Sequence, residues 1–192
     1  LAASHKRVWR QISEPGTWLT GETRIAIARE SRQAAHCVLC RKRKDALSPY
    51  QVAGSHDGFS GLSDEMVEAI HRIVTDPARL KRDWVDSLMS SGLSDAEYVE
   101  LVGVVCCTLS IDTFNRAAGL QPPLLPNPVA GEPSRIRPAE AKPGAAWLPW
   151  IAPEDAGPYP DEIFAATSAN IQRALSLVPA GANSFFDLVE AQ

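Results

Sequence analysis

The chain has 192 residues, of which 45% are hydrophobic and 22% charged, and its formal net charge is −4. This length and composition suffice for one hydrophobic core, and the negative charge argues against nucleic acid or an anionic membrane surface as a partner. No apolar stretch approaches the ~20 residues that a membrane span needs, and the N-terminus lacks the pattern of a signal peptide. We therefore expect a single-domain cytoplasmic protein.

The first part of the chain predicts two helices that lead toward a pair of cysteines. Apolar residues recur at helical spacing over 4–13, and Glu14-Pro15-Gly16 ends that helix. Thr20 is the expected N-cap of the second helix, which carries Glu30 toward Cys37. No segment alternates apolar and polar residues over the length of a strand, so we expect an all-α fold.

Three further helices are expected in the middle of the chain. Ser63 should cap the first, and the second should follow Asp76-Pro77. A capping box at residues 94–97 opens the longest apolar helix, 98–118, which must lie at the domain centre or at a subunit interface. The polar residues of this helix that are candidates to line a pocket are Tyr98, Glu100 and Asp112.

Residues 121–192 differ in composition from residues 1–120, which we expect to form the helical core. Prolines are dense after residue 120, but the apolar residues among them argue against disorder. We expect an extended arm, then helices over 170–177 and around 185–189, packed on the same domain or on a partner subunit. The long apolar helix and this arm together predict a homo-oligomer.

The stretch from Ile25 to Lys44 is the one that predicts chemistry. It leads an apolar helical run into a C-x-x-C pair, Cys37 and Cys40, which four cations follow. A thiol reacts as the thiolate, and a helix N-terminus, nearby cations and a C-x-x-C arrangement all lower its pKa. If a new helical turn starts near His36, Cys37 lies in its first turn and Cys40 lies one turn on, close enough for a reversible disulfide.

Glu30 is the candidate proton acceptor for this pair. It lies seven residues before Cys37, which is two helical turns. On a continuous helix the carboxylate and the first sulfur would therefore share a face.

This run resembles the alkylhydroperoxidase D and carboxymuconolactone decarboxylase superfamily, and within it the peroxidase-related branch. The hallmark of that branch is an apolar, Ala-rich helix with an acidic residue that runs into C-x-x-C. The resemblance implies an alkylhydroperoxidase D-like helical bundle, here with a Pro-rich C-terminal extension, in which residues 111–115 match the second core helix. It also implies that Cys40 attacks a peroxide and that Cys37 resolves the product as a disulfide.

Two positions depart from the proton relay of that family. The family has a histidine four residues after the second cysteine and a glutamate twelve residues before the first, where this chain has Lys44 and Ile25. The relay must therefore be rebuilt, and Glu30 with a histidine from elsewhere is the candidate. His56, in a glycine-flanked loop, is the leading substitute. His71, on a predicted helix, is the second choice, with a core histidine as the alternative.

We therefore predict a thiol-dependent oxidoreductase that reduces a small hydroperoxide. It would use an external dithiol reductant and no cofactor or metal, and its catalytic residues would be Cys40, Cys37, Glu30 and His56. Two alternatives stay open: a non-redox lyase, like carboxymuconolactone decarboxylases, that acts on a small aromatic-derived substrate, and a non-catalytic, oligomeric thiol switch.

Other uses of the cysteine pair are structural. A buried cysteine is often only a small hydrophobic side chain. A zinc site is the weakest interpretation, because it needs a second pair of ligands with tetrahedral spacing. Only Cys106 and Cys107 are on offer for that pair, and adjacent residues on a helix point in different directions.

Overall fold

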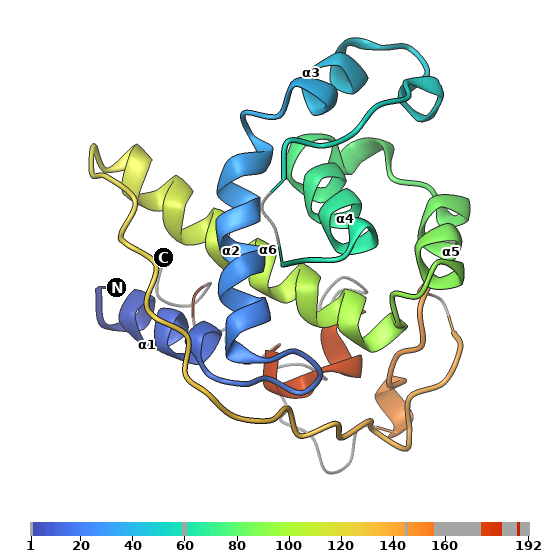
Figure 1. The fold of residues 1–192 in the computed structure, drawn as a ribbon. Helices are drawn as coiled ribbons and strands as arrows, with labels where there is room; N and C mark the ends of the chain where they lie inside the picture. Colours follow the sequence, from blue (N-terminus) through green and yellow to red (C-terminus); the bar gives the residue numbers. More distant parts are fainter. Residues whose placement is uncertain (1, 59–60, 145, 156–173, 182–187, 189–192) are drawn as a thin grey trace.

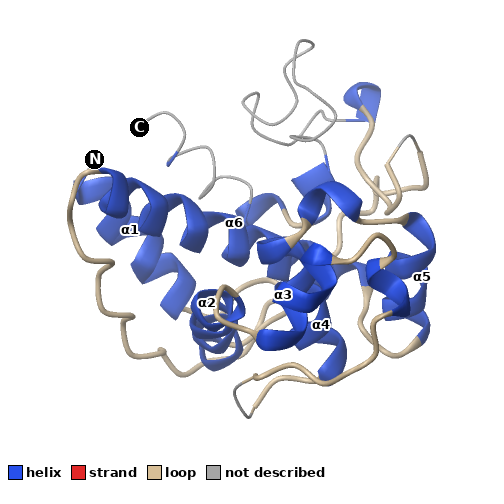
Figure 2. Cartoon of the chain, turned by 90° about the horizontal axis from the view of Figure 1, so that it is seen from above, coloured by secondary structure: helices blue, strands red, loops and turns tan. Residues whose placement is uncertain are grey.

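A computed structural model of the chain describes residues 2–58, 61–144, 146–155, 174–181 and 188. The α-helices are α1 (Ala2–Ser13), α2 (Gly21–Ala34), α3 (Val38–Asp45), α4 (Asp64–Thr75), α5 (Arg82–Ser90) and α6 (Asp95–Ala117). Short 3-10 helices are η1 (Pro49–Gln51), η2 (Pro77–Arg79), η3 (Pro153–Asp155) and η4 (Ala174–Leu177). The described residues contain no strand beyond one isolated antiparallel bridge, between Lys142 and Trp150, so the all-α expectation is confirmed (Figure 2).

Helices α2, α4 and α6 pack against one another and form the centre of the molecule. In Figure 1, α6 passes behind α2 and α4, and α1 lies against the lower end of α2. Each of the three helices contributes side chains with no exposed surface. Burying one such apolar side chain typically stabilises the fold by roughly 1.5–3 kcal/mol. These side chains include Ile27, Ile70, Leu101 and Ile111. The long apolar helix therefore lies at the domain centre.

Three helices begin at the residues predicted from the sequence, because an N-cap hydrogen bond joins residues only three positions apart. Thr20 accepts a hydrogen bond from the Thr23 backbone N–H at 3.2 Å, and Ser63 caps α4 in the same way. Ser94 and Glu97 form the reciprocal capping box of α6. Each cap typically contributes about 1 kcal/mol.

Helix α2 does not continue into the cysteines. Its last turn closes with i to i+3 hydrogen bonds, His36 N–H to Gln33 O and Cys37 N–H to Ala34 O. The Asp57 carboxylate, from a distant loop, accepts a hydrogen bond from the Val38 N–H at 3.1 Å, at the first residue of α3. The expectation that Glu30 and Cys37 share one continuous helix face is therefore wrong.

The described part of the proline-rich arm lies along its own chain. Backbone hydrogen bonds join Val129 to Ser13 at 2.7 Å and Arg135 to Thr17 at 2.7 Å. Of the two C-terminal helices expected, residues 174–177 form the 3-10 helix η4, while residues 170–173, 185–187 and 189 lie outside the described residues. The homo-oligomer stays a prediction. In the described part of the chain, no helix is both long and apolar enough to cross a membrane.

A buried ion pair joins α2 to α6. Arg24 Nε lies 3.4 Å from Glu100 Oε1, and the two side chains are 9% and 2% exposed. Glu100 Oε2 also accepts the Trp18 backbone N–H, and a Cβ on Gly16 would collide with Oε1, so glycine is required there. Burial lowers the pKa of Arg24 and raises that of Glu100, which shows that both charges are desolvated.

Of the three polar residues expected to line a pocket on α6, Glu100 borders a cavity of about 350 Å³. Asp112 instead accepts two hydrogen bonds from Arg32, both at 2.8 Å. Tyr98 is buried, and burial raises its pKa to about 12.

Replacing Glu100 by alanine is expected to lower the free energy of unfolding by roughly 3–5 kcal/mol, because it leaves the Arg24 guanidinium buried without its counter-charge. Urea denaturation measures this change. The control is Arg82→Ala, which breaks a pair whose side chains are 63% and 57% exposed and should change stability by less than about 0.5 kcal/mol. If both substitutions lowered the free energy of unfolding equally, the buried pair would contribute no more to stability than the exposed pair.

Candidate functional site at Cys37 and Cys40

The two cysteines lie at the start of α3. Cys37 is the N-cap residue, with extended backbone angles of φ −62° and ψ 128°, and Cys40 lies in the first turn. Both are buried free thiols. Cys37 therefore begins a new helical segment and Cys40 follows one turn later. The N–H groups of a helix N-terminus favour negative charge at this position.

Two histidines from separate parts of the chain reach these sulfurs. His56 follows η1, and its Nδ1 lies 3.6 Å from Cys37 Sγ and 3.5 Å from Cys40 Sγ. His71 lies on α4, and its Nδ1 lies 3.2 Å from Cys40 Sγ. The two sulfurs and two ring nitrogens all lie within 4.8 Å of one another, and we call these four residues the Cys2His2 cluster.

A carboxylate lies at hydrogen-bond distance from Nε2 of each histidine in the cluster. His71 Nε2 lies 2.7 Å from Glu30 Oε1, and both side chains are fully buried. His56 Nε2 lies 2.7 Å from Glu68 Oε2. Because an ionised carboxylate only accepts hydrogen bonds, Nε2 of each ring carries a proton and donates it. Each ring therefore turns its Nδ1 toward the sulfurs.

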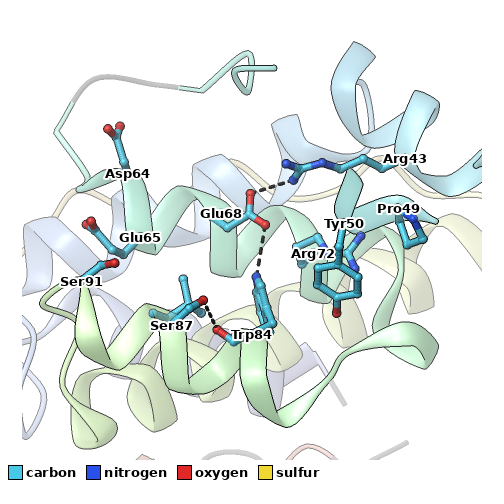
Figure 3. Close-up of a pocket in the computed structure, with 11 residues that line it drawn as sticks. Arg43, Pro49, Tyr50, Asp64, Glu65, Glu68, Arg72, Trp84, Ser87 and Ser91 are labelled. Atoms are coloured by element: carbon cyan, nitrogen blue, oxygen red, sulfur yellow. Dashed lines mark hydrogen bonds and ion pairs between the residues drawn. The ribbon is translucent and has the colours of Figure 1, made fainter. Parts of the chain in front are cut away.

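Glu68 anchors the His56 side of the cluster. Its Oε2 also accepts a hydrogen bond from Arg43 at 2.8 Å, and its Oε1 accepts one from Trp84 Nε1 at 3.2 Å, as Figure 3 shows. Burial alone would raise the pKa of Glu68, but the hydrogen bonds from His56 and Arg43 lower it to about 2. Glu68 is therefore an anion at neutral pH.

The two histidines differ in charge. Burial alone would lower the pKa of His56, but its hydrogen bonds with Cys40, Glu68 and Cys37 raise it to about 10. Burial has the largest effect on the pKa of His71 and lowers it. The hydrogen bond with Glu30 raises this pKa and the nearby charge of His56 lowers it, so that the net pKa is lowered. At neutral pH His56 is protonated and His71 is neutral, so His71 is the ring that can accept a proton.

The cysteines also differ in their surroundings. Burial raises the pKa of Cys37, but hydrogen bonds from the backbone N–H groups of Asp57 and Cys40 and from the His56 side chain outweigh it, so the net pKa is lowered. On α6, burial raises the pKa of Cys106 and raises that of Cys107 to about 12. The surroundings of Cys37 therefore favour its thiolate, whereas those of Cys106 and Cys107 favour the thiol.

A cavity of about 290 Å³ borders the two cysteines. Two of the cations that follow the pair in the sequence, Arg41 and Lys44, line it, and Val74 and Thr75 close it from α4. A larger cavity of about 600 Å³ borders His56 and Glu68. Two cavities therefore border members of the cluster, and the one at the cysteines is lined by cations.

The structure brings the four residues expected from the sequence into one site, but it changes their connections. Glu30 lies at hydrogen-bond distance from His71, whose ring stands between its carboxylate and the sulfur of Cys40. His71, the second choice, makes the shortest contact with Cys40. Lys44, at the position of the family's relay histidine, lines the cavity next to the cysteines.

Sequence reasoning missed Glu68 and underrated His71. A signal for His71 was present, because it lies four residues after Val67 and three before Val74 and so shares the apolar face of α4. An ionisable residue on such a face needs a buried partner. Glu68, three residues before His71, carried no comparable signal in the sequence.

Comparison of the chain with protein-family models, with curated proteins and with solved structures gives no match. The resemblance to the alkylhydroperoxidase-like superfamily therefore stays a prediction. The function has to be inferred from the chemistry of the Cys2His2 cluster and the carboxylates behind it.

Proposed function

We propose that the chain is a thiol-dependent oxidoreductase that reduces hydroperoxides through Cys40 and Cys37. The observation that supports this most is a buried chain of two contacts. Cys40 Sγ lies 3.2 Å from His71 Nδ1, and His71 Nε2 lies 2.7 Å from Glu30 Oε1. A thiol, an imidazole and a carboxylate in this order form an activated nucleophile, in which the carboxylate orients the base.

The first step is attack by Cys40 on the peroxide. His71 accepts the thiol proton at Nδ1, and the thiolate attacks one oxygen of the O–O bond. That bond breaks, sulfur becomes a sulfenic acid, and the departing alkoxide takes the proton back from His71 to leave as an alcohol. The imidazolium that forms in between faces the Glu30 carboxylate, which stabilises it.

The second step makes the disulfide. The Cys37 thiolate, one helical turn away, attacks the sulfur of the Cys40 sulfenic acid, the S–O bond breaks, and the leaving hydroxide takes up from solvent the proton that the Cys37 thiol had released, to form water. An external dithiol then reduces the disulfide and is itself oxidised. Each cycle converts one hydroperoxide and two thiols of the reductant into an alcohol, water and one disulfide.

The surroundings of Cys37 suit it for the resolving role. Backbone N–H groups and His56 stabilise its thiolate and lower its pKa, which favours the form that attacks the sulfenic acid. The resemblance to the peroxidase-related branch agrees with this assignment of the two sulfurs. His71 from α4 would then take the place of the relay histidine that this chain lacks at Lys44.

The test is a peroxide-consumption assay with the reduced, chelator-treated protein, hydrogen peroxide and dithiothreitol. We expect many turnovers per chain, and the Cys106→Ser variant should keep the wild-type rate because Cys106 lies outside the cluster. A thiol switch would consume about one equivalent of peroxide and stop. A lyase would consume none beyond the background of the reductant, and either result would refute the proposed activity.

A further inference from the structure

His56 and Glu68 take no part in the proton relay proposed above, which uses His71 and Glu30. They form a second imidazole–carboxylate pair beside the first, with the two imidazole ring centroids 4.2 Å apart, and His56 Nδ1 lies 3.5 Å from Cys40 Sγ. Glu68 is fixed in turn by Arg43 and Trp84. The two sulfurs therefore face two imidazoles, each of which contacts a carboxylate.

The spacing of the four ligand atoms fits a tetrahedral metal ion. Bonds of about 2.3 Å to sulfur and about 2.0–2.1 Å to nitrogen, at tetrahedral angles, place a sulfur and a nitrogen about 3.6 Å apart. Three of the four sulfur to nitrogen distances in the cluster are 3.2, 3.5 and 3.6 Å. All four atoms lie within 4.8 Å of one another, so one ion could contact them all after small shifts of the side chains.

The chemistry of the donors selects the metal. Two thiolates and two imidazoles form a ligand set that suits Zn²⁺, which takes four such ligands tetrahedrally in closed sites. We infer that Cys37, Cys40, His56 and His71 bind one Zn²⁺ ion in the reduced protein. The ion would take the place of the proton on His56 Nδ1 and would balance the charge of two buried thiolates.

The carboxylates behind the histidines support the inference independently of the spacing. A histidine that binds zinc usually donates its other ring N–H to a carboxylate or carbonyl, which fixes the ring and strengthens the ligand. Here both histidines do so, at 2.7 Å each. Both therefore present Nδ1 to the sulfurs in the orientation that a metal ion needs.

The inference goes beyond the proposed activity and does not depend on it, since the site requires only reduced thiols and the two rings. The two uses of the sulfurs exclude each other, because a disulfide between Cys37 and Cys40 removes both thiolate ligands. Zinc-bound thiolates would also be held away from peroxide. The chain would then bind the metal in its reduced form and release it on oxidation.

The experiment is an anaerobic titration of the reduced, chelator-treated full chain with Co²⁺, which reports on tetrahedral sulfur ligation by its visible bands and its near-ultraviolet charge-transfer band. We expect saturation at one Co²⁺ per chain and displacement of the ion by Zn²⁺. Absence of the sulfur charge-transfer band, or weak binding at several ions per chain, would overturn the site. No peroxide is involved, so this result is separate from the outcome of the turnover assay.

Variants show whether the four side chains are the ligands. His56→Asn should weaken Co²⁺ binding at least about 10–100-fold, the range seen even when only an outer partner is lost. The matched control is His36→Asn, which removes an exposed imidazole beside Cys37 and should bind as the wild type does. Equal affinities of the two variants would refute the assignment.

A second variant tests the site with a substitution that should leave the fold intact. Glu68→Gln keeps all four ligands and changes a side chain that is 25% exposed, so the helices should remain, as circular dichroism would verify. It should weaken Co²⁺ binding about 10–100-fold, because His56 loses the negatively charged acceptor that orients the ring and strengthens it as a ligand. Unchanged affinity of a folded Glu68→Gln variant would contradict the role given to the outer carboxylates.

Discussion

Replacing Cys40 by serine is expected to abolish peroxide turnover. A serine hydroxyl at this position is not ionised near neutral pH and cannot form a sulfenic acid, so neither the attack nor the disulfide is possible. Replacing Cys37 by serine should still let one peroxide per chain react in the absence of reductant, because Cys40 and its relay are intact, and should slow turnover with dithiothreitol, which must then reduce the Cys40 sulfenic acid directly. The assay with dithiothreitol and a measurement of the initial peroxide burst separate the two variants.

The comparison with α6 supplies the control for these substitutions. Cys106 is partly buried in another part of the domain, and burial raises its pKa. Cys106→Ser removes a thiol that is more exposed than Cys37 and Cys40 and does not belong to the cluster. If Cys106→Ser lost turnover while Cys40→Ser kept it, the site would have been assigned to the wrong cysteines.

Replacing His71 by asparagine is expected to slow the reaction of Cys40 with peroxide by about 10²–10⁴-fold, the usual contribution of a positioned acid-base group. Asparagine fills part of the ring's volume but cannot accept the thiol proton from Cys40 at neutral pH. Stopped-flow measurement with excess peroxide gives the rate constant directly, and chelator in the buffer keeps metal out of the comparison.

Two further variants make this prediction specific. His36→Asn removes a histidine that is exposed and next to Cys37, and it should react as fast as the wild type. Glu30→Gln is nearly isosteric and should slow the reaction in the same direction as His71→Asn, since the imidazolium loses its counter-charge. A wild-type rate in a folded His71→Asn variant, combined with a slow His56→Asn variant, would move the relay to His56.

The elements that could be predicted from the sequence are those set by local chemistry. Thr20, Ser63 and Ser94 cap their helices through side chain to backbone contacts within three residues, and the C-x-x-C spacing alone places Cys37 and Cys40 one turn apart. The glycine after α6, Gly119, has a positive φ of 74°, as expected for a residue that ends a helix.

The contacts that could not be predicted join distant parts of the chain. Cys40 and His71 are 31 residues apart, and Glu30 and His71 are 41 residues apart, so no local pattern reports either pair. The break before α3 likewise depends on Asp57, which reaches back 19 residues to the Val38 N–H. Tertiary contacts of this kind override the preference of a helical sequence to continue.

The metal site escaped prediction for a related reason. In the sequence the only second pair of cysteines is Cys106 and Cys107, which are adjacent. The two histidines are 15 residues apart and belong to a loop and a helix, and only the fold shows that both face the sulfurs. Ligand spacing in the sequence is a reliable guide only where one local motif supplies the pair.

The most direct measurement of the central claim, that Cys40 attacks the peroxide and Cys37 resolves it, identifies the oxidised sulfur by mass spectrometry. Each protein is treated with one equivalent of hydrogen peroxide in the presence of dimedone, which traps sulfenic acids, and is then digested. We predict a Cys37–Cys40 disulfide in the wild type and trapped sulfenic acid on Cys40 in the Cys37→Ser variant. Free thiols at both positions in the wild type, or faster trapping on Cys37 in the Cys40→Ser variant, would contradict the claim.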